Sequence, residues 1–361
     1  MSKRHQPRRI DVCLASLYIY DAWHRQTPND DYIWGSTHFS FNNEKGCSWL
    51  CVFGEPPEDW RTIIPHPRRI AIIAEPPSIE TYVGGYLNQF GIVISPYKKP
   101  LSYRGQWHRS PPYISWYYGL KRSNPEKKST PPYKKWSAIK APKKKTKRIS
   151  VVCSGKTLNR FQAQRQRFVV ALQQALGTQI DIYGKNDNPI ADKADAIDPY
   201  RYHIALENNQ DTHFWTEKLA DSYLGEAYPI YAGCPNLHDY FPRQSYTSIN
   251  IFNIPQAIEK VKDILASNLY ETNKAHILEA KRRVMEEHQL FPAIDRLVRQ
   301  QEPSLPSSTE HLTQSEPIQQ SQMFLSSVRR RYHHYTGYGY WHKRKRKLAR
   351  SIKKRLPFSL S

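Results

Sequence analysis

The chain has 361 residues, with 54 Lys and Arg side chains against 32 Asp and Glu, a formal net charge of +22. Residues 121–148 carry a net +11 and residues 329–361 a net +12, so the rest of the chain is near neutral at −1. A protein that binds nucleic acid over its folded faces spreads basic residues across them. The uneven charge distribution weakens the interpretation of this chain as a nucleic-acid-binding protein but does not exclude it.

The length suggests two domains, and no apolar run approaches the roughly 20 residues of a membrane-spanning helix. The amino-terminal residues lack the apolar core of a signal peptide. Cysteines are odd in number and scattered, and Cys47 and Cys51 have no second pair of ligands nearby. We therefore expect reduced cysteines in a cytosolic protein and no zinc site.

The first 120 residues consist of short apolar runs separated by turns, which predicts a first domain built on strands. The predicted strands are Val12–Tyr18, Trp49–Phe53, Arg69–Ala74 and Gly91–Ser95. Residues 121–148 are rich in Lys and Pro and have no apolar periodicity. They are predicted to be a basic linker between domains.

Strands alternate with helices over residues 149–300, which predicts a second, parallel α/β domain. The predicted strands are Ile149–Cys153, Gln179–Tyr183, His203–Leu206 and Tyr228–Ala232; the predicted helices are Arg160–Leu176, His213–Leu224, one opening at Asn253 and one over 270–290. Gly177 and Gly225 follow two of the helices, as expected at helix ends.

Residues 301–328 are predicted to be a disordered linker, because the polar stretch 301–322 lacks the apolar content to fold. The basic tail, 329–361, places Ala349, Ile352 and Leu356 on one side of a predicted helix, after several Tyr and a Trp. This pattern is typical of an amphipathic membrane anchor. Contact with nucleic acid and a solvated, disordered tail are the alternatives.

Arg165 is the first anomaly, because it lies in the middle of the inward-facing apolar stripe of the helix predicted at Arg160–Leu176. A buried guanidinium is costly unless an anion meets it, and a phosphate fits its donors well. The alternatives are pairing with a structural carboxylate, or a side chain whose charged end reaches the surface.

A second cluster follows the strand His203–Leu206. Glu207 and Asn208 end that strand, and Glu217 and Lys218 fall in the first turn of the next helix. Ligands of open α/β sheets bind at the carboxyl ends of strands, and a helix N-terminus attracts a diphosphate. Glu217 is suited to accept hydrogen bonds from a ribose, although a first-turn acid often only complements the helix dipole.

Glu75 is the third candidate, since it lies where an apolar strand meets the rigid turn Pro76-Pro77. A carboxylate held on a fixed backbone at the end of a strand suits a general base. On position alone, a capping or solvated acid is an equal alternative.

Residues 203–218, then Pro229–Gly233 and Asp239–Phe241, resemble the C-terminal domain of glycosyltransferase family 10, the α-1,3/4-fucosyltransferases, of the bacterial type. The family pattern is Phe/Leu-Glu-Asn, a short loop, Tyr-x-Thr-Glu-Lys and a Pro-x-x-x-Gly strand. The likeness is clear over about 149–265 and weaker over 69–100. One position differs, because the family tyrosine before Thr-Glu-Lys is Phe214 here.

The resemblance implies an α/β fold of the GT-B type, with two Rossmann-like domains that face a central cleft and the nucleotide sugar on the second. It implies that donor contacts come from residues throughout the second domain: Ser154, Arg165, Glu207, Asn208, Phe214, Glu217 and Lys218. It places the general base at Glu75.

The implied reaction is inverting transfer of L-fucose from GDP-fucose to a hydroxyl of a glycan acceptor, such as lipopolysaccharide or another surface polysaccharide. No obligatory metal or other cofactor is expected, because no Asp-x-Asp motif adjoins the predicted site, and Asp192, Asp195 and Asp198 are expected to be solvated. The tail is expected to hold the enzyme on the anionic inner face of the cytoplasmic membrane, and nucleic acid is not expected as a partner.

Two alternatives to this function stay open. Phe214 is compatible with a related GT-B transferase that uses another nucleotide sugar. The basic segments are compatible with a nucleic-acid or membrane-binding protein whose α/β body does not catalyse.

Overall fold

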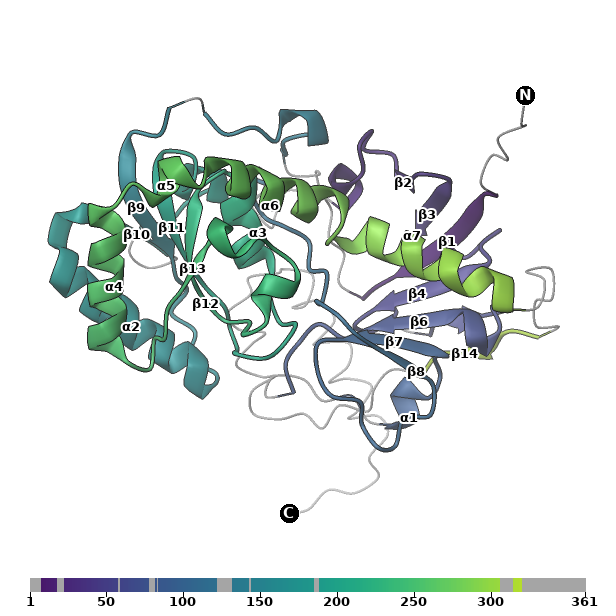
Figure 1. Cartoon of the computed structure of the whole chain (residues 1–361). Helices are drawn as coiled ribbons and strands as arrows, with labels where there is room; N and C mark the ends of the chain where they lie inside the picture. Colours follow the sequence, from purple (N-terminus) through teal and green to yellow (C-terminus); the bar gives the residue numbers. More distant parts are fainter. Residues whose placement is uncertain are drawn as a thin grey trace, which may run out of the picture.

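A computed structural model describes residues 8–17, 23–57, 59–77, 82, 84–121, 132–142, 144–184, 188–305 and 314–319. Two α/β units, each built on a mainly parallel sheet, lie side by side and are joined by two chain crossings (Figure 1). This is a GT-B architecture, as expected. The basic tail 329–361, with its predicted amphipathic helix, lies outside the described residues.

The first sheet has seven strands in the order β2-β3-β1-β4-β6-β7-β8, and only the β2–β3 pair is antiparallel. These strands are β1 Ile10–Ala15, β2 Ile33–Trp34, β3 Thr37–Phe41, β4 Trp49–Phe53, β6 Arg69–Ile72, β7 Ile92–Ser95 and β8 Gln106–Arg109. The short elements of this domain include η1 Trp23–Gln26, β5 Arg61–Thr62, η2 His66–Arg68 and α1 Gly84–Leu87. The four predicted strands are found, whereas β2, β3 and β8 were not predicted.

The second sheet has five parallel strands in the order β10-β9-β11-β12-β13. Its strands are β9 Lys147–Val152, β10 Ile180–Tyr183, β11 Tyr200–Leu206, β12 Tyr228–Ala232 and β13 Thr247–Ser248. The helices of this domain are α2 Arg160–Leu176, α3 Glu217–Leu224, α4 Ile254–Ala266, α5 Leu269–Thr272 and α6 Lys274–Glu286, with turns η3 Trp136–Ala138, η4 Gly177–Gln179, η5 Lys193–Ala196, η6 Leu237–Asp239 and η7 Arg243–Ser245. The predicted alternation of strand and helix is confirmed, although α3 begins four residues later than predicted.

Helix α7, Leu290–Gln301, belongs to the first domain, although the predicted boundary placed it in the second. Figure 1 shows α6 leading into α7, which lies over the first sheet. Phe291 and Ile294 share a buried cluster with Trp49 and Phe53 of β4. Strand residues alternate between faces, so the other face of β4 packs under α1 instead. The second crossing between domains therefore lies at residues 287–290.

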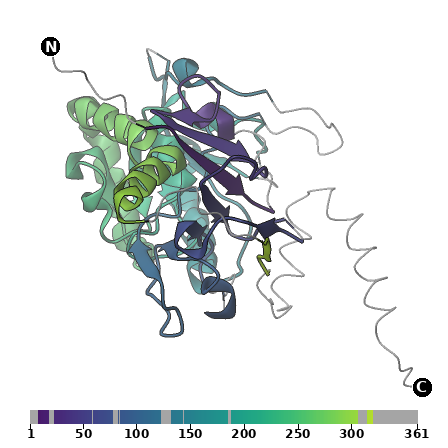
Figure 2. The same ribbon diagram turned by 90° about the vertical axis from the view of Figure 1, so that its right-hand side faces the viewer.

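The prediction that residues 301–322 are disordered is wrong for the described part of that segment. Glu302–Ser304 form the turn η8, and Glu316–Pro317 form β14, which pairs antiparallel with β5 (Figures 1 and 2). Ile318 is 3% exposed within the first core, and Glu316 pairs with Arg69 at 2.7 Å. A buried isoleucine, backbone pairing and the ion pair with Arg69 hold a segment whose composition predicts disorder.

The described part of the Lys-rich segment 121–148 also departs from a solvated linker. Trp136–Ala138 form η3, Ile139 is 3% exposed, and β9 begins at Lys147. Lys145 is 4% exposed and donates hydrogen bonds to the carbonyls of Ile197, Asp198 and Gly225, at 2.7–3.1 Å. Burial lowers the pKa of Lys145 to about 7. Asp192, predicted to be solvated, is also buried, at 6% exposed.

All five cysteines are buried and free, and within the described residues no helix is long and apolar enough to span a membrane.

Candidate active site

The carboxyl ends of β9 and β11 bring together the first group of predicted site residues. Ser154 follows β9, Asn208 follows β11, and Arg165 projects toward both from α2. Asn159 caps α2, its side chain accepting from the Gln162 amide at 2.8 Å and donating to the Asn208 carbonyl at 3.1 Å. The helix that carries Arg165 is thereby fixed to the edge of the sheet.

Arg165 is 2% exposed, as its place in the apolar stripe of α2 predicts. Its Nη1 donates to Asn208 Oδ1 at 2.8 Å, and its Nη2 donates to Ser154 Oγ at 3.2 Å. Its Nε has no hydrogen-bond partner, and no carboxylate pairs with it among the residues that the structure describes. A buried guanidinium held only by neutral oxygens retains an uncompensated positive charge, which an anion would meet.

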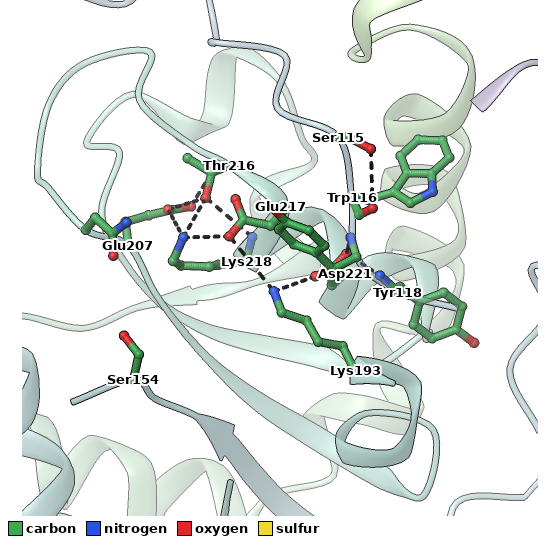
Figure 3. A network of polar contacts seen from close by, with 12 residues as sticks. Ser115, Trp116, Tyr118, Ser154, Lys193, Glu207, Thr216, Glu217, Lys218 and Asp221 are labelled. Atoms are coloured by element: carbon green, nitrogen blue, oxygen red, sulfur yellow. Dashed lines mark hydrogen bonds and ion pairs between the residues drawn. The ribbon is translucent and has the colours of Figure 1, made fainter. Parts of the chain in front are cut away.

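Glu207 has a different role from the predicted donor contact. It is fully buried, and its two oxygens accept from the Thr216 amide at 2.8 Å and the Thr216 hydroxyl at 2.6 Å (Figure 3). Burial raises the pKa of Glu207. Because Thr216 is the N-cap of α3, Glu207 positions that helix rather than facing a ligand.

Glu217 and Lys218 form the first turn of α3, and Lys218 Nζ contacts Glu217 Oε1 at 2.7 Å. Glu217 is 8% exposed. Burial raises its pKa, but Lys218 and Lys193 outweigh burial and lower the pKa to about 2. The helix therefore presents an ionised carboxylate beside an ammonium, which suits hydrogen bonds from hydroxyl groups and attraction of a phosphate.

The loop between β11 and α3 is held in shape by His213, whose backbone has a φ of 65°. Its amide donates to Asn236 Oδ1 at 2.7 Å, and its Nδ1 lies 2.6 Å from the Tyr240 hydroxyl. Phe214 and Trp215 follow and are both buried, Trp215 packing against Phe241 with ring centroids 5.0 Å apart. These contacts make the loop a rigid part of the site.

Tyr97, from the segment after β7, brings the first domain to this loop. Its ring lies against Phe214, and its pKa is raised first by burial and then by the charges of Glu75 and Asp211. Arg109, at the end of β8, also donates to the Thr212 hydroxyl across the interface. Glu75 is thus on the first domain, in the electrostatic neighbourhood of the loop that precedes α3.

The pattern of the family described as "Glycosyltransferase family 10 (fucosyltransferase) C-term" matches residues 142–287, which contain Arg165 and both ends of the loop. This match identifies residues 142–287 as a glycosyltransferase family 10 domain. The matched range covers the second sheet and its helices up to α6.

Two curated relatives match the chain over short stretches. An α-(1,3)-fucosyltransferase, FucT, of Helicobacter pylori is 30% identical over 74 residues, 20% of this chain and 16% of that protein. A putative fucosyltransferase-like protein of Arabidopsis thaliana is 29% identical over 94 residues, 25% of this chain and 18% of that protein. The matches span less than a fifth of either relative's length.

Solved structures resemble the chain over more of its length but at low identity. A crystal structure of an α1,3-fucosyltransferase with GDP has a TM-score of 0.47 at 17% identity, covering 80% of this chain and 94% of that one. A DNA-modifying β-glucosyltransferase has a TM-score of 0.45 at 8% identity, covering 80% and 99%.

In this family 10 domain, the predicted donor residues form two groups. Arg165 contacts both Ser154 and Asn208, while Glu217 and Lys218 form a pair at the start of α3. Phe214 is buried against the other domain. The described residues contain no group of three or more His, Cys, Asp or Glu side chains arranged to hold a metal ion.

Tyr97 and Lys193 border the site but were not predicted from the sequence. Lys193 Nζ lies 2.7 Å from Asp221 and 3.9 Å from Glu217, so it borders the site from a turn far from α3 in sequence. Lys193 stands among alternating acids, a pattern usual on solvated surfaces, and no signal in the sequence marked it. Tyr97 is one of 24 tyrosines and was equally unmarked.

Proposed function

We propose that the chain is an inverting glycosyltransferase that transfers L-fucose from GDP-fucose to a hydroxyl group of a glycan acceptor. The observation that carries this proposal is Arg165, a buried cation without a carboxylate partner among the described residues, at the carboxyl edge of a parallel sheet. A diphosphate would supply the missing negative charge. The family supports fucose as the sugar and GDP as the leaving group.

In the proposed reaction, Glu75 accepts the proton of the acceptor hydroxyl. The oxygen of that hydroxyl attacks the anomeric carbon of fucose. The bond from that carbon to the diphosphate breaks, and GDP leaves with the electron pair. Arg165, Lys218 and the N-terminus of α3 would stabilise the charge that develops on GDP. Glu217 would accept hydrogen bonds from the ribose hydroxyls, and its lowered pKa keeps it ionised for that role.

The proposed acceptor is a glycan such as lipopolysaccharide or another surface polysaccharide, reached at the inner face of the cytoplasmic membrane. The support for this location is the basic, aromatic composition of residues 329–361. The last described residues before the tail, 314–319, pack on the first domain beside Gln89. The proposed base, Glu75, lies on that same domain.

The test is a donor screen that measures nucleotide release with a panel of glycan acceptors. GDP-fucose is compared with GDP-mannose and with UDP-sugars, and the product anomer is determined by NMR. Acceptor-dependent GDP release from GDP-fucose, with an α-linked product, is the expected result. Turnover of another donor in its place would favour the related transferase that Phe214 allows, and turnover of none of them would contradict the proposal.

A further inference from the structure

The first crossing between the two domains, residues 115–119, has its backbone bound by side chains from both sides. From the first domain, Arg25 donates to the carbonyls of Trp116 and Tyr118, and Gln26 accepts from the Trp116 amide. From the second, Asp221 accepts from the Tyr117 and Tyr118 amides, both at 2.9 Å, and Asp192 accepts from the Gly119 amide, also at 2.9 Å. Four consecutive amides of the crossing are therefore fixed by side chains.

Asp221, the residue that holds two of those amides, is fully buried on α3, and its charge is balanced by Lys193. Lys193 Nζ lies 2.7 Å from Asp221 Oδ2 and 5.2 Å from the centre of the Tyr117 ring. The Asp221 side chain is 1% exposed and that of Lys193 is 15% exposed. A buried carboxylate of this kind depends on its partner, because little water reaches it.

Lys193 also faces the donor side of α3. Its Nζ lies 3.9 Å from Glu217 Oε1, the oxygen that accepts from Lys218 (Figure 3). Figure 3 shows the ammonium of Lys193 between the two carboxylates, with Thr216 and Lys218 on one side and Trp116 and Tyr118 on the other. One cation is therefore shared by a carboxylate of the donor site and the carboxylate that grips the interdomain crossing.

We propose that Lys193 is a positioning residue, which couples occupancy of Glu217 by the nucleotide ribose to the interdomain crossing through Asp221. This inference rests on the proposed function for the binding of a nucleoside diphosphate at Glu217. Ribose hydroxyls that donate to Glu217 disperse its charge, and Lys193 then interacts more fully with Asp221. The crossing at Tyr117 and Tyr118 tightens, and the first domain, with Glu75, is held against the donor.

The test compares the wild-type chain with variants that remove the coupling but keep the hydrogen bonds from the Tyr117 and Tyr118 amides to residue 221. Asp221→Asn retains an acceptor oxygen for both amides, and the double variant Lys193→Met with Asp221→Asn leaves no lone buried charge. Lys193→Arg is the conservative variant. Lys281→Met is the matched control, because Lys281 is 12% exposed and pairs with Glu226 at 2.9 Å without contacting Glu217.

GDP affinity is measured by calorimetry, the radius of gyration by small-angle X-ray scattering with and without GDP, and steady-state constants with GDP-fucose. We expect GDP to compact the wild type, Lys193→Arg and Lys281→Met. The double variant and Asp221→Asn should bind GDP with an affinity within about threefold of that of the wild type, but GDP should not compact them. Their kcat should fall at least tenfold, while the donor KM changes less than threefold.

Three other results would contradict the coupling, and one of them would also contradict the proposed function. Compaction and kcat of the wild type in a folded double variant would overturn the coupling. Binding of GDP by the wild type with no change in scattering would overturn the coupling alone. Absence of GDP binding by the wild type would overturn both the coupling and the proposed function.

Discussion

The rings of Tyr97 and Phe214 lie against each other across the domain interface, with centroids 6.0 Å apart and planes inclined by 32°. Tyr97 belongs to the first domain and Phe214 to the loop that precedes α3 in the second. Both side chains are buried, at 8% and 2% exposed. The contact joins the domain of the proposed base to the domain of the proposed donor site.

The Tyr97 hydroxyl is buried without a hydrogen bond of ordinary geometry in the described structure, although the Asn209 side chain lies close enough to lower its pKa. A buried polar group without a partner costs free energy, so its removal costs little. We expect Tyr97→Phe to leave the free energy of unfolding unchanged or raise it by about 1 kcal/mol, as measured by urea denaturation. Tyr97→Ala, which removes the ring, should lower it by about 3 kcal/mol. Destabilisation of Tyr97→Phe equal to that of Tyr97→Ala would contradict this account.

The segment 314–319 is predicted to stabilise the first domain. Ile318 is 3% exposed, and its truncation leaves a cavity beside the face of the sheet that α1 covers. We expect Ile318→Ala to lower the free energy of unfolding by about 2–4 kcal/mol. Ile63→Ala is a control, because Ile63 is 40% exposed and should change stability by less than about 1 kcal/mol. Equal effects of the two substitutions would show that the segment does not contribute.

The second domain could be predicted well because its elements are long and periodic. The helix Arg160–Leu176 was predicted with the bounds that the structure has, since its apolar stripe and Gly177 agree. Burial of Arg165 followed from the same periodicity. The strand β9 was predicted within two residues at its start because Val and Ile mark a buried parallel strand.

The features that could not be predicted depend on contacts between residues distant in sequence. Helix α7 is amphipathic in either domain, so its own pattern could not show that it packs on β4, some 240 residues earlier. Glu207 was predicted to contact the donor because the family resemblance implies it. Its burial follows from Thr216 turning back onto it, which no local pattern encodes.

Glu75→Gln is predicted to lower kcat about 10²–10⁴-fold, because the amide cannot accept the proton of the acceptor hydroxyl. GDP affinity should change less than threefold, since Glu75 is on the first domain and the donor residues are on the second. Both quantities are measured on the same preparation by product formation and calorimetry. Retained turnover would remove Glu75 from the role of base and leave the donor site unaffected.

His203 predicts a pH dependence of stability. Burial, with the charges of Lys193 and Lys145, lowers its pKa to about 3 from an ordinary 6.5. Below pH 6.5 the unfolded chain binds a proton at this site that the folded chain does not, so the free energy of unfolding falls as pH falls. The loss is roughly 1.4 kcal/mol for each pH unit between about 6 and 3.

The test for His203 is urea denaturation of the wild type and His203→Gln at pH 7, 6 and 5. The glutamine can still form a hydrogen bond with Ser150, which lies 2.8 Å from the His203 Nδ1. The free energy of unfolding of the wild type minus that of His203→Gln should fall as pH falls, because only the wild type carries the histidine penalty. A constant difference across the three pH values would contradict the prediction.

Arg165→Met is predicted to separate stability from function. The wild-type guanidinium is buried and contacts only neutral oxygens among the described residues, so its removal should change the free energy of unfolding by no more than about 1 kcal/mol. GDP affinity should fall about 30-fold or more, since a charge-assisted contact to a phosphate contributes about 2 kcal/mol. Arg167→Met, an exposed change on the same helix, should alter neither quantity. If Arg165→Met bound GDP as tightly as Arg167→Met, the buried cation would serve the fold and not the diphosphate.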